Sequence, residues 1–342
     1  MTTSNDLRST ARELVAQGKG ILAADESFPT IGKRFKALEI ESNEENRRAY
    51  RDMLFTTDGL EDHISGVILF EETIEQSASD GTPFPDLLQR KGIVPGIKVD
   101  KGAKDLALFP NEKVTEGLDG LRDRLERFHS QGARFTKWRA VIAIGDAIPS
   151  DYCIKANADA LGRFAALSQE AGFVPIVEPE VLMDGGHSIE QCYEVSARTL
   201  EALFDELERA RVELPGALLK TNMVLSGVKA SERAGVEDVA RQTVACLKET
   251  VPAEIGGIVF LSGGQTDEQS TAHLDAMNRM GPHPWELSFS YGRALQAPAM
   301  KAWKGDPSKV EAGQRALLHR ARLNGAARSG SYSPDMEELV AA

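Results

Sequence analysis

Residues 173–180 read Phe-Val-Pro-Ile-Val-Glu-Pro-Glu, a pattern that recurs along the whole chain. The apolar run Phe173–Val177 ends directly at two carboxylates. Short runs rich in β-branched and aromatic residues are typical of strands that are buried on both faces. The sequence predicts eight such strands. The other seven runs are Gly20–Ala24, Gly66–Phe70, Ile93–Lys98, Arg134–Trp138, Ala217–Lys220, Gly257–Leu261 and Glu286–Phe289.

The segments between these runs have the periodicity of amphipathic helices. In Glu190–Arg211 apolar residues recur at three- and four-residue steps between charged ones, and Leu161–Ala171 and Val236–Glu249 behave alike. Strands that alternate with helices favour parallel pairing, and eight of them favour closure over an open sheet. We therefore predict an α/β fold, namely a (β/α)8 TIM barrel.

The whole chain, residues 1–342, is expected to form one domain. The barrel is expected at about residues 20–325, with additional N-terminal helices at Asp6–Gln17 and Asn43–Thr56. The segment from about residue 326 to 342 contains Ser, Gly and Pro, which favours a mobile tail.

Composition limits the partners and the compartment. The net charge of −12 disfavours nucleic-acid binding, which depends on Lys and Arg neutralising phosphates. Cys153, Cys192 and Cys246 are far apart and odd in number, which fits a reducing compartment. The N-terminal residues lack the apolar segment of a secretory signal, and no apolar run is long enough to span a membrane. We expect a cytoplasmic protein that binds neither nucleic acid nor membrane.

Ionisable residues follow the predicted strands, where the active site of a barrel lies. Lys220 ends the sixth run. Its amine is a nucleophile only when deprotonated. Burial and a neighbouring cation, such as Lys137, favour the deprotonated form. Strand alternation points Glu178 and Glu180 the same way, and paired carboxylates suit general acid–base work. Asp25 follows the first run. Each residue alone also fits an ordinary strand-end or helix-cap role; the combined pattern predicts a catalytic site.

Glycine-rich segments follow the last two predicted strands, where barrels often bind phosphate. They are Ser262-Gly263-Gly264 and Tyr291-Gly292-Arg293, and the arginine can add a bidentate contact. The six histidines show no metal-ligand spacing, and neither a P-loop nor a GxGxxG segment occurs. We expect no metal and no cofactor.

Eight stretches in order resemble the class I fructose-bisphosphate aldolases over roughly Leu7–Gly330. The stretches are Gly20–Ser27, Gly66–Glu72, Gly96–Gly102, Lys137–Arg139, Val174–Glu180, Leu218–Met223, Phe260–Gln265 and Ser288–Gln296. The resemblance implies a Schiff-base enzyme of glycolysis and gluconeogenesis that reversibly cleaves fructose 1,6-bisphosphate to dihydroxyacetone phosphate and glyceraldehyde 3-phosphate. It also implies a homotetramer.

The resemblance also implies residue roles. Lys220 matches the Schiff-base lysine, Glu178 the acid–base group, and Asp25 the carboxylate beside the C4 hydroxyl, with Glu180 and Lys137 as polar companions. The implied substrate and phosphate contacts are Ser27, Arg34, Lys98, Arg139, Ser262, Gly263, Gly264, Ser290, Tyr291, Gly292 and Arg293.

The chain departs from the family pattern in three places. Thr221 stands where the family often has proline, and Phe28-Pro29 replaces small residues. The last tyrosine is Tyr332, whereas many family members have a tyrosine at the C-terminus that assists proton exchange at the enamine. The group that protonates the enamine is therefore left open. Three other readings stay open: a lysine-dependent aldolase or transaldolase acting on a sugar monophosphate, an inactive barrel that binds ligands, and a zinc-dependent aldolase.

Overall fold

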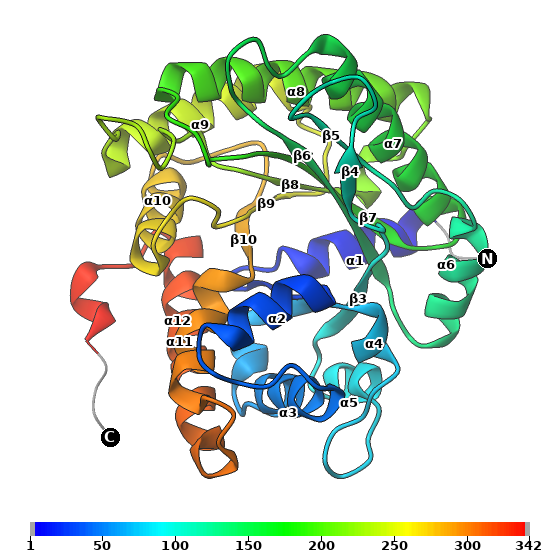
Figure 1. Cartoon of the computed structure of the whole chain (residues 1–342), viewed down its shortest axis with the longest axis vertical. Coiled ribbons are helices and arrows are strands. Elements are labelled where there is room, and N and C mark those ends of the chain that lie inside the picture. Colours follow the sequence, from blue (N-terminus) through cyan, green and yellow to red (C-terminus); the bar gives the residue numbers. More distant parts are fainter. Residues whose placement is uncertain (1–3, 339–342) are drawn as a thin grey trace.

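The computed structural model describes residues 4–338 and contains a closed barrel of parallel strands (Figure 1). Neighbouring strands are hydrogen-bonded in the order β1-β10-β9-β8-β7-β6-β3-β2. Each predicted apolar run overlaps one barrel strand, so the predicted (β/α)8 TIM barrel is confirmed. The strands are β1 (Gly20–Ala24), β2 (Ile64–Leu69), β3 (Val94–Lys98), β6 (Phe135–Ile142), β7 (Val174–Val181), β8 (Leu218–Thr221), β9 (Ile258–Phe260) and β10 (Leu287–Tyr291).

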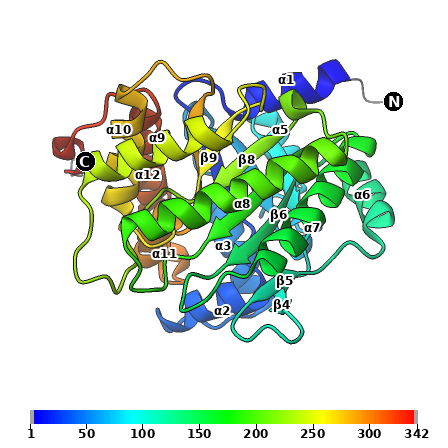
Figure 2. The ribbon, with the colours of Figure 1, turned by 90° about the horizontal axis from the view of Figure 1, so that it is seen from above.

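Helices surround the barrel, and two long ones, α7 and α8, cover the outer face of β6 and β7 (Figure 2). The α-helices are α1 (Ser4–Leu14), α2 (Phe28–Lys36), α3 (Glu44–Phe55), α4 (Glu71–Ile74), α5 (Phe84–Arg90), α6 (Leu121–Ser130), α7 (Asp151–Glu170), α8 (Ile189–Arg209), α9 (Val236–Thr250), α10 (Asp267–Arg279), α11 (Arg293–Trp303) and α12 (Val310–Arg328). The remaining elements are the antiparallel hairpin of β4 (Ala103–Asp105) and β5 (Lys113–Thr115), and the 3-10 helices η1 (Leu60–Asp62), η2 (Leu214–Gly216), η3 (Pro307–Lys309) and η4 (Pro334–Glu337).

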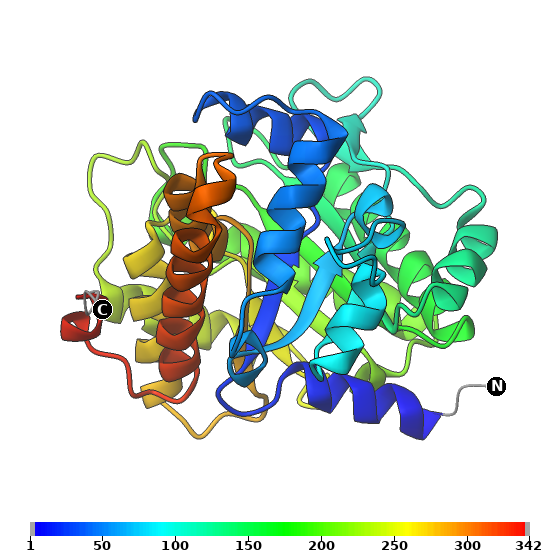
Figure 3. The same ribbon diagram turned by 90° about the horizontal axis from the view of Figure 1, so that it is seen from below.

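Helix α1 closes the end of the barrel at which the strands begin. Leu7, Ala11 and Leu14 of α1 share one buried apolar cluster with residues of the barrel interior, including Phe135 and Val259. Helices α1 and α2 lie at opposite ends of the barrel (Figure 3). Because apolar side chains fill the α1 end, polar chemistry is confined to the end where the strands finish.

Side-chain caps define the start of two helices that border that end. Ser188 and Gln191 form a capping box at α8, and Thr266 and Gln269 form another at α10. Each box satisfies backbone N–H groups that a helix start otherwise leaves unpaired. The cap at α10 fixes where the loop that follows β9 ends.

The chain end packs against the barrel further than the sequence predicted. Helix α12 continues to Arg328, and Ala327 and Arg328 are buried. The backbone N–H of Tyr332 donates to Asp275 Oδ1 at 2.9 Å. The first residues of the predicted tail thus belong to α12, and Tyr332 is hydrogen-bonded to α10. Residues 339–342 of that predicted tail lie outside the described part.

Within residues 4–338, no helix combines the length and the apolarity needed to cross a membrane.

Candidate active site

A cavity of about 490 Å³ lies at the carboxyl ends of the barrel strands. All predicted site residues line it except Gly264 and Tyr291. The described lining is Ala23, Asp25, Glu26, Ser27, Thr30, Arg34, Lys98, Asp100, Gly102, Ala103, Lys137, Arg139, Val141, Glu178, Glu180, Lys220, Leu261, Ser262, Gly263, Ser290, Gly292 and Arg293.

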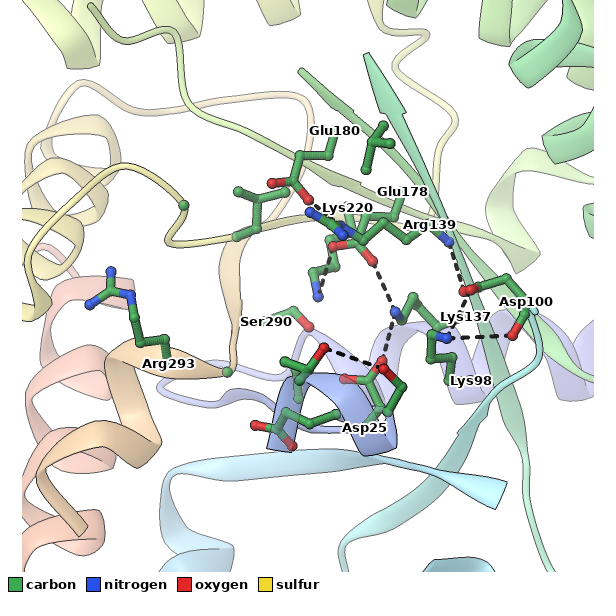
Figure 4. Close-up of a pocket in the computed structure, with 18 of the residues that line it drawn as sticks. Asp25, Lys98, Asp100, Lys137, Arg139, Glu178, Glu180, Lys220, Ser290 and Arg293 are labelled. Atoms are coloured by element: carbon green, nitrogen blue, oxygen red, sulfur yellow. Dashed lines mark hydrogen bonds and ion pairs between the residues drawn. The ribbon is translucent and has the colours of Figure 1, made fainter. Parts of the chain in front are cut away.

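Four side chains at the centre form a line of alternating charge (Figure 4). Lys220 Nζ on β8 lies 3.1 Å from Glu178 Oε1 on β7. Glu178 Oε2 lies 3.3 Å from Lys137 Nζ on β6, which lies 2.6 Å from Asp25 Oδ2 directly after β1. All four side chains are almost fully buried. Lys220, Glu178 and Lys137 come from the neighbouring strands β8, β7 and β6, whereas Asp25 follows β1, which β3 and β2 separate from β6. The groups still meet because all carboxyl ends lie at one rim of the barrel.

The shared charges fix which groups are ionised. Burial alone would raise the pKa of Asp25, but the charges of Lys137 and Lys220 outweigh it and hold the pKa far below its usual range. The pKa of Glu178 is lowered in the same way, against burial, by Lys220 and Lys137. Burial would lower the pKa of Lys137, yet Asp25 and Glu178 raise it well above its ordinary value. Lys137 is therefore a fixed cation between two carboxylates at neutral pH.

A second ion pair lies beside this line. Arg139 Nε on β6 donates to Glu180 Oε2 on β7. Burial opposes the charged guanidinium, but Glu180, and then Glu178, raise the pKa of Arg139 above its ordinary value. Because Glu178 and Glu180 are two residues apart on β7, both carboxylates face the cavity, as the alternation predicted.

The Arg293 end of the cavity is formed by small residues and one arginine. Ser262, Gly263, Ser290 and Gly292 line it, and an added Cβ at Gly292 would lie 3.2 Å from the carbonyl oxygen of Ala23. Arg293 itself is engaged by protein. Its Nη1 lies 3.0 Å from Asp267 Oδ1, and its Nη2 donates to the carbonyls of Ser262 and Gln265. Figure 4 shows its guanidinium apart from the central lysines.

The opposite end carries two cations, each with its own carboxylate. Lys98 Nζ at the end of β3 lies 2.8 Å from Asp100 Oδ1, and Arg34 Nη1 on α2 pairs with Glu26 Oε1. Ser27, the residue before α2, also lines this end, and its hydroxyl lies 3.3 Å from that of Thr30.

The structure places two predicted phosphate contacts elsewhere. Tyr291 belongs to β10, and its fully buried hydroxyl donates to the carbonyl of Ser270 at 2.8 Å. Alternation along β10 thus turns Ser290 toward the cavity and Tyr291 away from it. Gly264 has a left-handed φ of +75°, and an added Cβ would meet Met183 at 2.5 Å. It borders the start of α10 instead.

Three polar lining residues have no assigned role from the sequence. Glu26 and Asp100 each lie one or two residues beyond a predicted site residue, and Thr30 lies on α2. Their nearness to Asp25 and Lys98 in sequence was the available signal. Asp100 also accepts from the backbone N–H of Gly102 at 3.1 Å, which fixes the turn after β3.

Comparison with known proteins identifies the family. A family model described as "Fructose-bisphosphate aldolase class-I" matches residues 6–342. A "Probable fructose-bisphosphate aldolase class 1" of Xanthomonas campestris pv. campestris is 59% identical over 95% of this chain and 98% of that protein. The chain belongs to the class I fructose-bisphosphate aldolase family. "Fructose-bisphosphate aldolase 4, cytosolic" of Arabidopsis thaliana is 49% identical over 97% of this chain and 85% of the other.

A solved structure of the same family superimposes closely on the barrel. Fructose-bisphosphate aldolase from Plasmodium falciparum, in a ternary complex with TRAP and a small-molecule inhibitor, matches with a TM-score of 0.95. The two chains are 46% identical, and the match covers 97% of each. The class I aldolase fold thus extends over nearly the whole chain.

The structure shows the contacts of two residues at which the chain departs from the aldolase pattern, Thr221 and Tyr332. Thr221 ends β8, opposite Phe260 of β9, and its carbonyl accepts from the backbone N–H of Leu261 at 3.0 Å. The hydroxyl of Tyr332 donates to Glu337 Oε1 at 2.9 Å, and Tyr332 does not belong to the described cavity lining. Tyr332 is thus placed to anchor the chain end and not to reach a bound sugar.

Proposed function

We propose that this class I aldolase cleaves fructose 1,6-bisphosphate through an iminium ion on Lys220. The observation that carries the proposal is the buried Lys220 amine, 3.1 Å from a carboxylate that a fixed cation, Lys137, also contacts. A buried amine with an adjacent acid–base group is the arrangement that covalent amine catalysis needs.

Glu178 serves the formation of the iminium. Its carboxylate takes a proton from the Lys220 ammonium, and the free amine attacks the C2 carbonyl of the open-chain sugar. A second proton moves from the attacking nitrogen to the former carbonyl oxygen, which gives a neutral carbinolamine with a hydroxyl at C2. The same proton then returns to the departing hydroxyl, which leaves as water and yields the iminium. The Lys220–Glu178 distance is within the reach that direct proton transfer requires.

The cleavage step needs a base near the C4 hydroxyl. Asp25 or Glu178 accepts that proton, the C3–C4 bond breaks, and its electron pair moves into the iminium to form an enamine. Glyceraldehyde 3-phosphate leaves. Protonation of the enamine at C3 and hydrolysis then release dihydroxyacetone phosphate and restore the amine.

The two ends of the cavity fit the two phosphates. Lys220 attacks C2, which is next to C1, so the C1 phosphate lies toward Ser262, Gly263, Gly292 and Arg293. Asp25 serves C4, and the charge of Lys98 acts on Asp25. The C6 phosphate therefore lies toward Lys98, Arg34 and Ser27, while Arg139 lines the cavity beside the central charges and Ser290 lines the C1 end.

Borohydride trapping tests the covalent step. The protein is incubated with dihydroxyacetone phosphate, reduced and digested, and the modified lysine is located by mass spectrometry. We expect the adduct on Lys220, its absence in Lys220→Met, and its retention in Lys101→Met, which removes an exposed lysine outside the cavity. A folded protein that forms no adduct on any lysine contradicts the mechanism.

The paired cations at the C6 end favour a bisphosphate over a monophosphate. Arg34→Ala and Lys98→Ala are expected to lower kcat/KM for the bisphosphate. If both variants keep wild-type activity on the bisphosphate, the monophosphate aldolase becomes the better reading.

We further propose a cytoplasmic homotetramer whose ligands are sugar phosphates, with neither nucleic acid nor membrane as a partner. The family membership supports the tetramer, and the relative with "cytosolic" in its name supports the compartment. Sedimentation-equilibrium mass and cell fractionation measure these two properties; a monomer mass or a membrane-pellet signal contradicts them.

A further inference from the structure

A buried arginine lies behind the C6 end of the cavity. Arg51 on α3 has a side chain that is 4% exposed, and its Nη2 lies 2.6 Å from Glu26 Oε2. The other oxygen of Glu26 pairs with Arg34. Glu26 and Arg34 line the cavity, whereas Arg51 does not belong to the described lining. Arg51 therefore reaches the site only through Glu26.

Gln296 holds Arg51 in this orientation. Its Oε1 accepts from Arg51 Nη1 at 3.2 Å and from the hydroxyl of Tyr50 at 3.0 Å. Its Nε2 donates to the carbonyl of Ala23 on β1 at 2.6 Å. Gln296 on α11 is fully buried. Three elements, α3, α11 and β1, thus fix one guanidinium against Glu26.

The formal charges at this end depend on that guanidinium. Arg34 and Lys98 are offset by Glu26 and Asp100, so these four lining side chains sum to zero. Arg51 adds one positive charge and brings the sum to +1. A phosphate dianion would find little net attraction at a neutral end, because long-range attraction follows the summed charge.

The centre of the cavity supplies no excess of positive charge. Asp25, Glu178 and Glu180 oppose Lys137, Lys220 and Arg139, three carboxylates against three cations. Arg51, behind the lining, is therefore the charge that makes the C6 end net positive.

We propose that Arg51 is a positioning residue that makes the C6 end selective for a phosphate by neutralising Glu26. The proposal rests on the proposed aldolase function. With Arg51 present, Glu26 orients Arg34 without repelling the phosphate. Without Arg51, the Oε2 atom of Glu26 loses its partner, Arg34 is left to offset the whole carboxylate, and Glu26 competes with the C6 phosphate for Arg34.

Two substrates isolate this effect. Fructose 1-phosphate lacks the C6 phosphate but keeps every reacting atom, so the ratio of kcat/KM for the bisphosphate to kcat/KM for fructose 1-phosphate reports the C6 contact. A general loss of catalytic power, or a smaller fraction of folded protein, lowers kcat/KM for both substrates equally and leaves the ratio unchanged. The ratio therefore separates the role of Arg51 from a structural one.

The test compares three variants with the wild-type protein. Arg51→Met is expected to lower the ratio about tenfold, from the loss of one unit charge near a dianion. The double variant Glu26→Gln/Arg51→Met removes the pair and keeps the sum at +1, so its ratio is expected to stay within about threefold of wild type. Arg328→Met, a buried arginine paired with Glu286 away from the cavity, is the matched control and is expected to leave the ratio unchanged.

The double variant keeps the proposal testable if Arg51→Met does not fold, since it leaves no unpaired carboxylate. An unchanged ratio in folded Arg51→Met overturns the inference, and so does a fall of more than about threefold in the double variant. The wild-type protein is tested before any variant. If it neither cleaves the bisphosphate nor forms the Lys220 adduct, the proposed aldolase function is contradicted, independently of the role of Arg51.

Discussion

Lys137 is the residue whose loss should disturb the site most, because it contacts two buried carboxylates. At an effective dielectric constant of about 20, the 2.6 Å contact with Asp25 corresponds to a Coulomb attraction of about 6 kcal/mol, and the 3.3 Å contact with Glu178 to about 5 kcal/mol. Desolvation of the ions offsets much of this. Removal of one member of a buried ion group typically costs about 3–5 kcal/mol in unfolding free energy. We expect that loss for Lys137→Met.

The same change should impair catalysis more than stability. Without Lys137, Asp25 and Glu178 lose the cation that contacts both of them, and their pKa values rise although Lys220, Lys98 and Arg139 remain nearby. In the wild-type protein their pKa values are depressed, so the stability they contribute is present above the ordinary carboxylate pKa and is lost as pH falls through the folded value. In Lys137→Met the folded pKa values move up toward the ordinary carboxylate value, so this stabilisation shrinks and the acid limb of the activity profile shifts to higher pH. Loss of one preorganised charge typically costs at least about 100-fold in kcat.

The assay for Lys137→Met couples triose-phosphate formation to NADH oxidation over a pH series, alongside urea unfolding. The control is Lys101→Met, which removes a half-exposed pair with Glu71 and should cost less than about 1 kcal/mol. If folded Lys137→Met keeps kcat/KM within about threefold of wild type with an unmoved acid limb, the central line of charges does not govern catalysis.

Three further changes have defined outcomes. Asp267→Asn releases Arg293 from a carboxylate, so KM for the bisphosphate should fall about two- to fivefold; a rise contradicts this reading. Gly292→Ala adds a methyl group that meets the carbonyl oxygen of Ala23 at 3.2 Å and must displace the backbone of the phosphate cradle, so KM should rise about tenfold with a modest fall in the melting temperature; an unaltered KM places the phosphate elsewhere. Burial lowers the pKa of His273 to about 4, so the unfolded state binds its proton more tightly and stability falls as pH drops from about 6.5. At pH 4 this loss is about 3 kcal/mol, and His273→Gln should remove it from urea-unfolding data collected at pH 4 and pH 7.5.

The strands were predictable because both faces of a parallel barrel strand are buried, which leaves an uninterrupted apolar run. The same rule misplaced the ends of β6 and β7. Their predicted runs stop at Trp138 and Val177, but the strands continue to Ile142 and Val181. The continuation carries the polar residues of the site, where function overrides the apolar pattern.

The strand-end rule also located most of the cavity lining, but it did not resolve which side chain faces inward. Ser290 and Tyr291 each carry a hydroxyl group, and both are buried in the structure. The sequence therefore offers no difference in polarity that would show which of the two faces the cavity and which faces the surrounding helices. Arg51 carried no signal of its own. It lies on α3, remote in sequence from Gln296, and only the three-dimensional packing brings Gln296 to Arg51 and Arg51 to Glu26.

The charges of the site also explain how a buried centre can pass through several ionic steps. A protonated Lys220 and an iminium on Lys220 carry the same charge, so the charges before and after iminium formation match. In between, the proton that leaves Lys220 neutralises Glu178, so neither group is charged alone. When the C3–C4 bond breaks, the iminium becomes a neutral enamine while a carboxylate gains the proton of the C4 hydroxyl. One positive and one negative charge vanish together, so the buried pair is never left uncompensated. A buried lone charge would cost several kcal/mol, and the pairing of Lys220 with Glu178 avoids that cost at each step, while Lys137 keeps the remaining carboxylate neutralised.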